Sequence, residues 1–208
     1  MALDLPGHGR ASADVGDASL RIMTGWLDET FDILGIREAH IVGHSMGAKI
    51  ALGFALAHPQ RVGGLALISP AGLGAEFHHG TLDAFLSNPA HGEALARDLL
   101  GPRGVHLIPA VARSLSDAAS DFAKSEALKK LLGQARAYGL ALSPEGFDWS
   151  KIRVPLTILW GDHDRLIPMP EVAPPAAARA GADHCRRGPF AAYEASGDVV
   201  SALKEFLP

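Results

Sequence analysis

The chain contains 208 residues, 48% of them apolar, and carries a formal net charge of −4. This length favours a single domain, and the apolar content is sufficient for a sizeable buried core. Acidic and basic residues are interspersed, which argues against nucleic acid or an anionic membrane as the main partner. No apolar run approaches the 18 or so residues that a membrane span requires.

The N-terminus and the cysteine content indicate the compartment. Asp4, His8 and Arg10 interrupt the N-terminus before the apolar segment of a signal peptide can form. The single cysteine, Cys185, excludes an intrachain disulfide framework and suits a reducing compartment. We therefore expect a cytoplasmic protein that acts on a small molecule, either alone or as a homo-oligomer.

The first predicted elements are a strand end and an amphipathic helix. The apolar residues of Met1–Leu5 predict the end of a buried strand, which Pro6–Gly9 terminates. Residues 18–34 predict a helix, because apolar side chains recur every three or four residues and Gly35 can end it. These apolar positions are Leu20, Met23, Leu27, Phe31 and Leu34.

The most informative segment is Gly43–Gly47, which reads Gly-His-Ser-Met-Gly. It follows a strand predicted at 40–42 and precedes a helix predicted at 46–57. A serine at the apex of a strand-to-helix turn is typical of a nucleophile elbow. Such a serine takes a strained backbone conformation, so we expect side chains at both flanking glycine positions to collide with the turn. The N–H of Met46 would lie at the helix N-terminus, where an oxyanion can bind.

The rest of the chain predicts further strands separated by a helical insertion. Apolar runs predict strands at 65–68 and 155–160, and residues 71–150 between them predict helices without a strand. The final helix is expected at 196–207. Helical patterns within the insertion cover residues 93–100, 107–115 and 122–132. Apolar strands that alternate with helices indicate an α/β fold, with a mostly parallel sheet covered on both faces.

Four segments in this order resemble the α/β-hydrolase fold family. They are Asp4–Arg10, the elbow at 43–47, Ser69–Gly74 and Trp160–Pro168. The resemblance implies a hydrolase core formed by residues 1–70 and 151–208, with residues 71–150 inserted as a helical cap. Asp14–Asp17 and Ser69–Gly74 are most similar to the hydrolase-like domain of acetoin dehydrogenase E2 components, the dihydrolipoamide acetyltransferases.

The family usually begins with three strands before the segment equivalent to Met1–Leu5. The loop after the third of these strands carries a His-Gly motif and supplies a second oxyanion-hole N–H. Neither this part nor the lipoyl domain of the E2 components occurs in the chain. We therefore expect an N-terminally truncated hydrolase fold that lacks one oxyanion donor.

The resemblance also implies a catalytic triad in the chain order serine, acid, histidine. Ser45 corresponds to the nucleophile and Asp164 to the acid, with Asp162 as the alternative acid. His184 is the only histidine after Asp164 and corresponds to the base that takes the serine proton. The N–H of Met46 corresponds to one donor of the oxyanion hole.

The sequence around the base departs from the family pattern. In the family a glutamate follows the histidine shortly, yet Glu194 lies ten residues after His184, and alignment back from Glu194 puts Pro189 at the histidine position. Residues 171–188 also lack a β-branched run and predict no strand. Either the loop is rearranged and His184 serves as the base, or the base has been lost. A local reading-frame error would give the same pattern.

The motifs support two classes of function. The first is a cofactor-independent serine hydrolase that cleaves an ester, thioester or C–C bond of a small apolar acyl substrate; an acyltransferase would use the same residues. The second is a catalytically impaired, hydrolase-like module that binds within an acetoin dehydrogenase-type complex. No metal site is expected, because the adjacent His78 and His79 point in different directions and no further ligand is suitably spaced.

Overall fold

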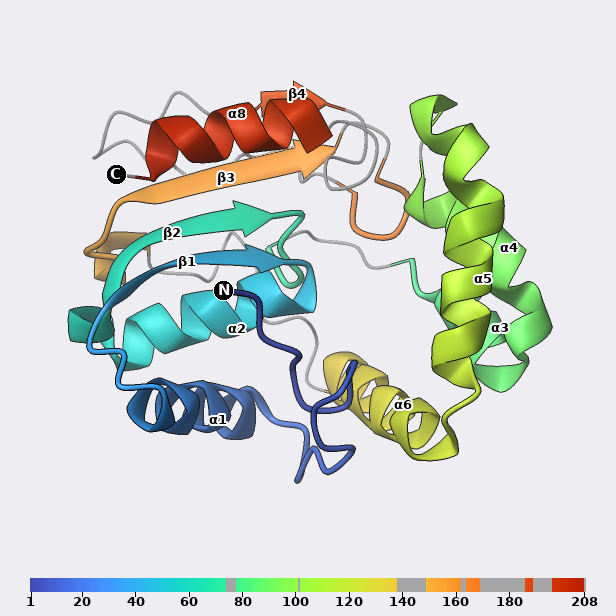
Figure 1. Cartoon of the computed structure of the whole chain (residues 1–208), viewed down its shortest axis with the longest axis horizontal. Coiled ribbons are helices and arrows are strands. Elements are labelled where there is room, and N and C mark those ends of the chain that lie inside the picture. Colours follow the sequence, from blue (N-terminus) through green and yellow to red (C-terminus); the bar gives the residue numbers. More distant parts are fainter. Residues whose placement is uncertain are drawn as a thin grey trace.

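A parallel sheet with the strand order β1-β2-β3-β4 forms the centre of the described chain. The computed structural model describes residues 1–73, 78–100, 102–137, 149–161, 164–168, 186–188 and 196–207. The strands are β1 (Ala39–His44), β2 (Val62–Ile68), β3 (Leu156–Gly161) and β4 (Arg186–Gly188). Each neighbouring pair is parallel. Figure 1 shows β1, β2 and β3 pointing the same way, with their carboxyl ends toward the green helices.

The register of the sheet brings the carboxyl ends of the strands together. His44 of β1 pairs with Ile68 of β2, which pairs in turn with Leu159 of β3. Residues that follow aligned positions in a parallel sheet emerge at the same edge, which is where open α/β sheets bind ligands. Ser45 and Ser69, which directly follow β1 and β2, therefore lie at this edge.

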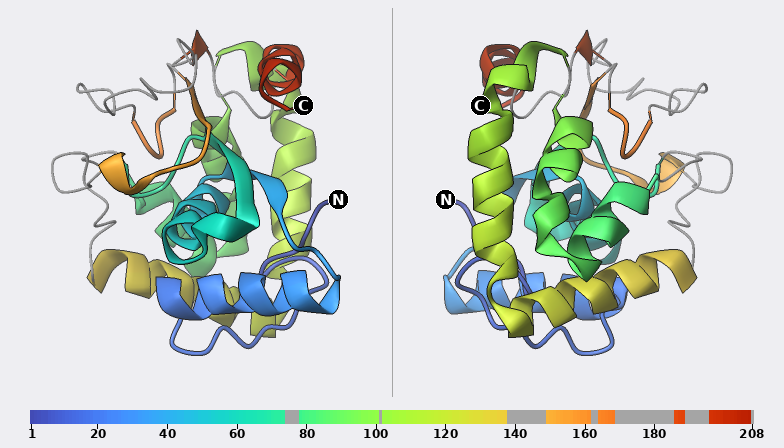
Figure 2. Two further views of the ribbon diagram at one scale, coloured as in Figure 1. Left: turned by 90° about the vertical axis from the view of Figure 1, so that its left-hand side faces the viewer. Right: turned by 90° about the vertical axis from the view of Figure 1, so that its right-hand side faces the viewer.

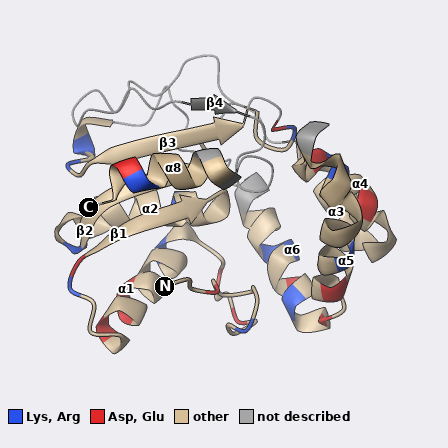
Figure 3. Ribbon diagram, turned by 45° about the horizontal axis from the view of Figure 1, so that its top comes forward, with Lys and Arg blue, Asp and Glu red and all other residues tan. Residues whose placement is uncertain are grey.

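Helices cover both faces of β2 and β3, whereas His40, Val42 and His44 on one face of β1 are exposed. Helices α1 (Leu20–Ile33) and α2 (Met46–Ala57) share one apolar cluster with Leu65, Leu67 and Ile158. Helix α8 (Ser196–Phe206) packs on the neighbouring positions Ile68 and Leu159. β1, β2 and β3 contain no Lys, Arg, Asp or Glu, and Figure 3 shows the charges on helices and loops instead. Burial on both faces explains why β2 and β3 are continuous apolar runs.

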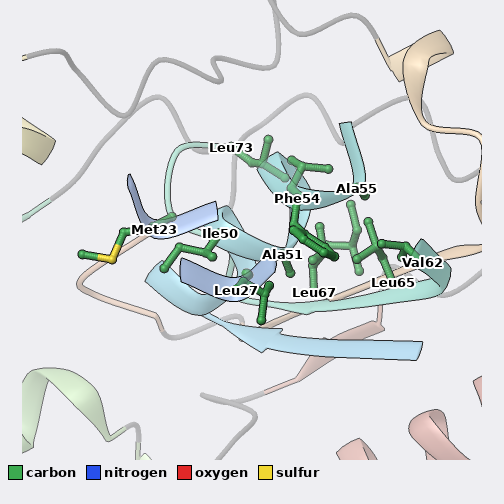
Figure 4. Close-up of a cluster of buried hydrophobic side chains, with 14 of the residues drawn as sticks. Met23, Leu27, Ile50, Ala51, Phe54, Ala55, Val62, Leu65, Leu67 and Leu73 are labelled. Carbon is green, nitrogen blue, oxygen red and sulfur yellow. The ribbon is translucent and has the colours of Figure 1, made fainter. Parts of the chain in front are cut away.

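The larger cluster lies between α1, α2 and the sheet (Figure 4). Phe54 of α2 is fully buried there, and its ring lies 5.1 Å from the ring of Phe31 and 4.9 Å from that of His58. Arg61, in the 3₁₀ turn η1 (Pro59–Arg61), fastens the start of β2 to α1. Its guanidinium contacts Asp28 at 2.7 Å and Asp32 at 2.8 Å.

Helices connect β2 to β3 in the described residues. They are α3 (Gly80–Ser87), α4 (Gly92–Leu99), α5 (Ile108–Ala119) and α6 (Phe122–Ala137), with 3₁₀ turns η2 (Pro89–His91), η3 (Pro102–Leu107) and η4 (Trp149–Lys151). Two apolar clusters hold these helices together, one around Phe85 and Leu95 and the other around Ala96 and Ile108. The right-hand view of Figure 2 looks onto these helices, which stand in front of the carboxyl ends of the strands.

Helix α6 also packs against the N-terminal loop. Ala127 and Leu131 join Val15 in the main apolar cluster. Lys124 donates a hydrogen bond to the carbonyl oxygen of Ala11, and Lys130 donates one to the carbonyl oxygen of Gly16. The helical segment is therefore attached to the core by side-chain contacts as well as by the chain itself.

Most of the predicted elements are confirmed within a few residues. The helix predicted at 46–57 has those bounds in the structure. The helix predicted at 18–34 begins at Leu20, where the Ser19 side chain accepts a hydrogen bond from the N–H of Ile22, and ends before Gly35, whose φ is +67°. The sequence did not indicate α3. The division into a core and a cap stays a prediction.

Two predictions about strands are wrong. Met1–Leu5 is not a strand: Met1 is 89% exposed, and Asp4 instead accepts a hydrogen bond from the N–H of Arg10, so that the segment folds back on itself. Residues 171–188, predicted to lack a strand, contain β4. Its residues pair with Leu159–Gly161, and this pairing forms the strand although the Arg-Arg-Gly sequence does not favour one.

No helix within the described ranges combines the length and the apolar character needed to cross a membrane.

Phe54→Ala should lower the free energy of unfolding by about 3–5 kcal/mol, because it removes a fully buried ring and leaves a cavity between α1 and α2. Chemical denaturation followed by circular dichroism measures this loss. Ile33→Ala is the control, since Ile33 is 84% exposed and its truncation should change the stability by less than about 0.5 kcal/mol. Equal losses in the two variants would contradict the described core.

Candidate active site

Ser45 occupies a strained turn between β1 and α2. Its φ is +52° and its ψ −116°, a conformation that costs a non-glycine residue about 1–3 kcal/mol. Hydrogen bonds to the next strand hold it there: the Ser45 N–H donates to the carbonyl oxygen of Ile68 at 2.9 Å, and the Ser45 carbonyl oxygen accepts from the N–H of Ala71 at 3.1 Å. The turn is thus fixed by β2 and not by local preference.

The two glycines of the elbow differ in their surroundings. A side chain at Gly43 would place its Cβ 2.6 Å from the Cα of Ala48 and 2.6 Å from the carbonyl oxygen of Gly47, so α2 can start here only because Gly43 has no side chain. A Cβ at Gly47 would meet only Leu5, at 3.9 Å, among the described residues. The predicted collision therefore holds at Gly43 and is wrong at Gly47.

The Ser45 hydroxyl is not used to cap α2. Ser45 is the N-cap residue, yet its side chain makes no capping hydrogen bond. Met46 is the first residue of the helix, so its N–H lies among the first-turn donors of α2, where the helix dipole favours negative charge. A hydroxyl that makes no capping hydrogen bond and an N–H suited to an anion are therefore adjacent.

Asp164 follows β3 and is held by backbone N–H groups. Its Oδ1 accepts hydrogen bonds from Leu166 at 3.0 Å and Ile167 at 2.8 Å, and the residue is 6% exposed. Its Oδ2 is buried and has no hydrogen-bond partner in the described part of the chain. Burial raises the pKa of Asp164 above its ordinary value, opposed chiefly by the N–H of Ile167 and the hydroxyl of Ser69. A buried carboxylate oxygen without a donor is where an imidazole N–H could bind.

Ser69 is a second strained residue at this edge. It follows β2 with a φ of +42°, is 1% exposed, and donates its N–H to the carbonyl oxygen of Leu159 at 2.8 Å. Its hydroxyl lies close enough to Asp164 to lower the pKa of that carboxyl. The geometry is not that of a hydrogen bond, since neither the Ser69 Oγ nor the Asp164 Oδ2 has a partner within the described ranges. The sequence indicated Ser69 only as part of a family motif, because its proximity to Asp164 depends on the pairing of β2 with β3.

Ser45 lies in the wall of a cavity of about 770 Å³. Met46 lines it beside Ser45, and so does Ile167, whose N–H holds Asp164. Side chains from α3 to α6 form much of the remaining wall, and most of them are apolar. Among them are Leu82, Phe85, Leu95, Leu115, Leu128 and Leu132. The space suits a small molecule with a substantial apolar part.

The structure thus brings together some of the predicted site residues. Ser45 and Met46 line the cavity, and Asp164 is anchored through a residue that also lines it. His184, Asp162 and Pro189 lie outside the described residues. The part of the chain that the structure describes contains no group of three or more His, Cys, Asp or Glu residues that could hold a metal ion. Lys49, which also lines the cavity, was not predicted.

A sequence model of the α/β-hydrolase fold matches residues 1–186. The chain belongs to the α/β-hydrolase fold family. The parallel sheet and its covering helices agree with this fold. Two hydrolase structures share this fold over 98% of the chain and 77% of their own length: the 2-hydroxy-6-oxo-6-phenylhexa-2,4-dienoate hydrolase of Rhodococcus, with a TM-score of 0.74 and 19% identity, and a serine hydrolase of Cycloclasticus, with 0.77 and 20%.

Among the curated relatives of this hydrolase-fold chain are an acetyltransferase component and a hydrolase. The dihydrolipoyllysine-residue acetyltransferase component of the acetoin cleaving system of Cupriavidus necator is 32% identical over all of this chain and 56% of its own length. A 2-hydroxy-6-oxononadienedioate/2-hydroxy-6-oxononatrienedioate hydrolase of Burkholderia vietnamiensis is 30% identical over 81% of this chain and 61% of its own length. The chain therefore spans somewhat more than half the length of these relatives.

Gly43→Ala should destabilise the protein by about 1–3 kcal/mol or more, because its Cβ would overlap backbone atoms that cannot move without shifting α2. Gly47→Ala is the matched control within the same turn and should be tolerated. Thermal unfolding followed by circular dichroism compares the two. A Gly43→Ala protein as stable as Gly47→Ala would contradict the close approach of β1 and α2.

Asp164→Asn should unfold at the same or a higher temperature than the wild type at pH 7. The pKa of Asp164 is raised in the folded state, so the ionised carboxylate costs stability above that folded-state pKa, and this cost disappears as the pH falls toward the ordinary value of 3.8. The advantage of the variant should therefore shrink between pH 7 and pH 4. Unfolding temperatures measured across this range test the sign, and an advantage that grew on acidification would contradict it.

Proposed function

We propose that this chain is a serine hydrolase that cleaves an ester, thioester or C–C bond of a small, largely apolar acyl substrate. The observation that carries the proposal is Ser45 itself. It is held in a strained turn, makes no capping hydrogen bond, and lines a cavity of about 770 Å³. If this position served only the fold, glycine would be expected there, because glycine adopts a positive φ without strain.

The chemistry begins with the Ser45 hydroxyl. Its oxygen attacks the substrate carbonyl carbon while a base removes its proton, and a tetrahedral intermediate forms. The negative oxygen of this intermediate is stabilised by the N–H of Met46 at the N-terminus of α2. The carbonyl re-forms, the leaving group departs with the proton from the base, and water then releases the acyl group by the reverse sequence.

His184 is the base in this proposal, and Asp164 orients it. The Oδ2 of Asp164, which has no partner among the described residues, would accept the Nδ1–H of the imidazole, which fixes the tautomer that can take the serine proton. The two backbone N–H groups on Oδ1 keep the carboxylate from rotating. Asp164 therefore has one oxygen for the fold and one for the base.

The helices α3 to α6 act as the cap that selects the substrate. Their apolar side chains line the cavity opposite the sheet edge, and α6 is fastened to the N-terminal loop. A relative named for hydrolysis of 2-hydroxy-6-oxononadienedioate supports C–C cleavage as one of the reactions considered.

A second candidate function is acyl transfer, or binding without catalysis, within an acetoin-cleaving system. The 32% identity to an acetyltransferase component over the whole chain favours it. An acyltransferase would form the same acyl-enzyme on Ser45 and pass the acyl group to a thiol or alcohol instead of water. Transfer to added dihydrolipoamide in competition with hydrolysis would separate the two reactions, since only a transferase gives the thioester as its main product.

A fluorophosphonate probe tests the nucleophile. Wild-type protein should be labelled on Ser45, and Ser45→Ala should not be labelled. Labelling should be slower by about four orders of magnitude in Asp164→Asn and by about six in His184→Ala. Ser87→Ala is the control, since Ser87 is exposed on α3 and its variant should be labelled like the wild type. No labelling of the wild type would overturn the proposal, and undiminished labelling of His184→Ala would exclude His184 as the base.

A further inference from the structure

Lys49 lies in the wall of the same cavity as Ser45. It is in the first turn of α2, and its backbone N–H donates to the carbonyl oxygen of Ser45 at 3.2 Å. Lys49 is four positions after Ser45, so the Cα atoms of these two residues lie ~6 Å apart along the helix axis. The Lys49 side chain is half-buried and lines the cavity together with apolar residues of α2 and the cap helices.

The Lys49 ammonium group has no anionic partner among the described residues, where it takes part in no hydrogen bond or salt bridge. Asp17 is the acidic residue that lines the same cavity, but its carboxylate accepts a hydrogen bond from the N–H of Ser19 at 2.9 Å. Hydrogen bonds from Ser19 chiefly lower the pKa of Asp17, with smaller contributions from Arg21 and Lys130 and none from Lys49. Asp17 is thus occupied elsewhere.

A half-buried ammonium group without a counter-ion is unfavourable. Desolvation lowers the pKa of Lys49 below its ordinary value, and no charge of a described residue opposes this effect. An apolar side chain such as leucine or methionine would fill this position in α2 without that cost. An anion entering the cavity would supply the partner that the described residues do not, and a carboxylate carries the single negative charge that matches one ammonium group.

We propose that Lys49 binds a carboxylate at the far end of the acyl substrate, so that the preferred substrates are acyl derivatives of dicarboxylic acids with an apolar middle. This inference rests on the proposed function, in which Ser45 attacks the carbonyl at the other end. The substrate would lie along the first turns of α2, with its carbonyl at Ser45 and Met46, its carbon chain against the apolar cap, and its carboxylate at Lys49.

Two p-nitrophenyl esters of equal chain length test the preference. One is p-nitrophenyl hexanoate and the other is the mono-p-nitrophenyl ester of adipic acid, which differs by a terminal carboxylate. The wild type should show the higher kcat/KM for the adipate ester, and Lys49→Met should reduce the ratio of the two values at least tenfold. Lys204→Met is the matched control: Lys204 is exposed on α8, outside the cavity, and its variant should keep the wild-type ratio.

A binding experiment separates this inference from the proposed function. In a Ser45→Ala background, calorimetry should find adipate bound at least tenfold more tightly than hexanoate, and Lys49→Met or Lys49→Gln should remove that difference. If the esters are not cleaved but the Lys49-dependent preference for adipate remains, the hydrolase proposal fails and the carboxylate site stands. If the esters are cleaved and neither Lys49 variant changes either ratio, the hydrolase stands and the carboxylate site is overturned.

Discussion

The site depends on one constraint, the left-handed backbone conformation of Ser45. The turn can exist because Gly43 lets α2 approach β1 to a distance that no Cβ would allow. It is then held in place by hydrogen bonds to Ile68 and Ala71 of the neighbouring strand and loop. The β1–β2 pairing therefore maintains the strained conformation of Ser45. The same contacts position the start of α2, which carries the N–H of Met46 and the side chain of Lys49.

Asp164 and Lys49, the buried acid after β3 and the half-buried base of α2, are supported differently. Asp164 has its Oδ1 saturated by backbone donors while its Oδ2 is left without one in the described residues, so the carboxylate is fixed in direction but still able to bind. Lys49 has no such support. Both groups are costly for the fold, since burial disfavours the charged form of each. Groups that the fold alone does not require are expected at sites of binding and catalysis.

The helices α3 to α6 supply much of the apolar wall of the cavity. They are joined to the core through two different kinds of contact: Ala127 and Leu131 pack into the main apolar cluster, and Lys124 and Lys130 donate to carbonyl groups of the N-terminal loop. The N-terminal segment is thus part of the support for α6, and it contributes His8 to the cavity wall. The shape of the cavity and the docking of this loop are consequently linked.

The sequence by itself determined the elbow, the helices α1 and α2, the central strands and the family, because each rests on a local pattern of apolar spacing, glycine and serine. It could not determine the state of Met1–Leu5 or of β4, since a strand exists only when another strand pairs with it. It also did not reveal the roles of Ser69 and Lys49. The proximity of Ser69 to Asp164 arises from the register of β2 with β3, and the missing partner of Lys49 is apparent only when the cavity and its other charges are known. Residues adjacent in a local pattern can be predicted, whereas those brought together by packing required the tertiary structure.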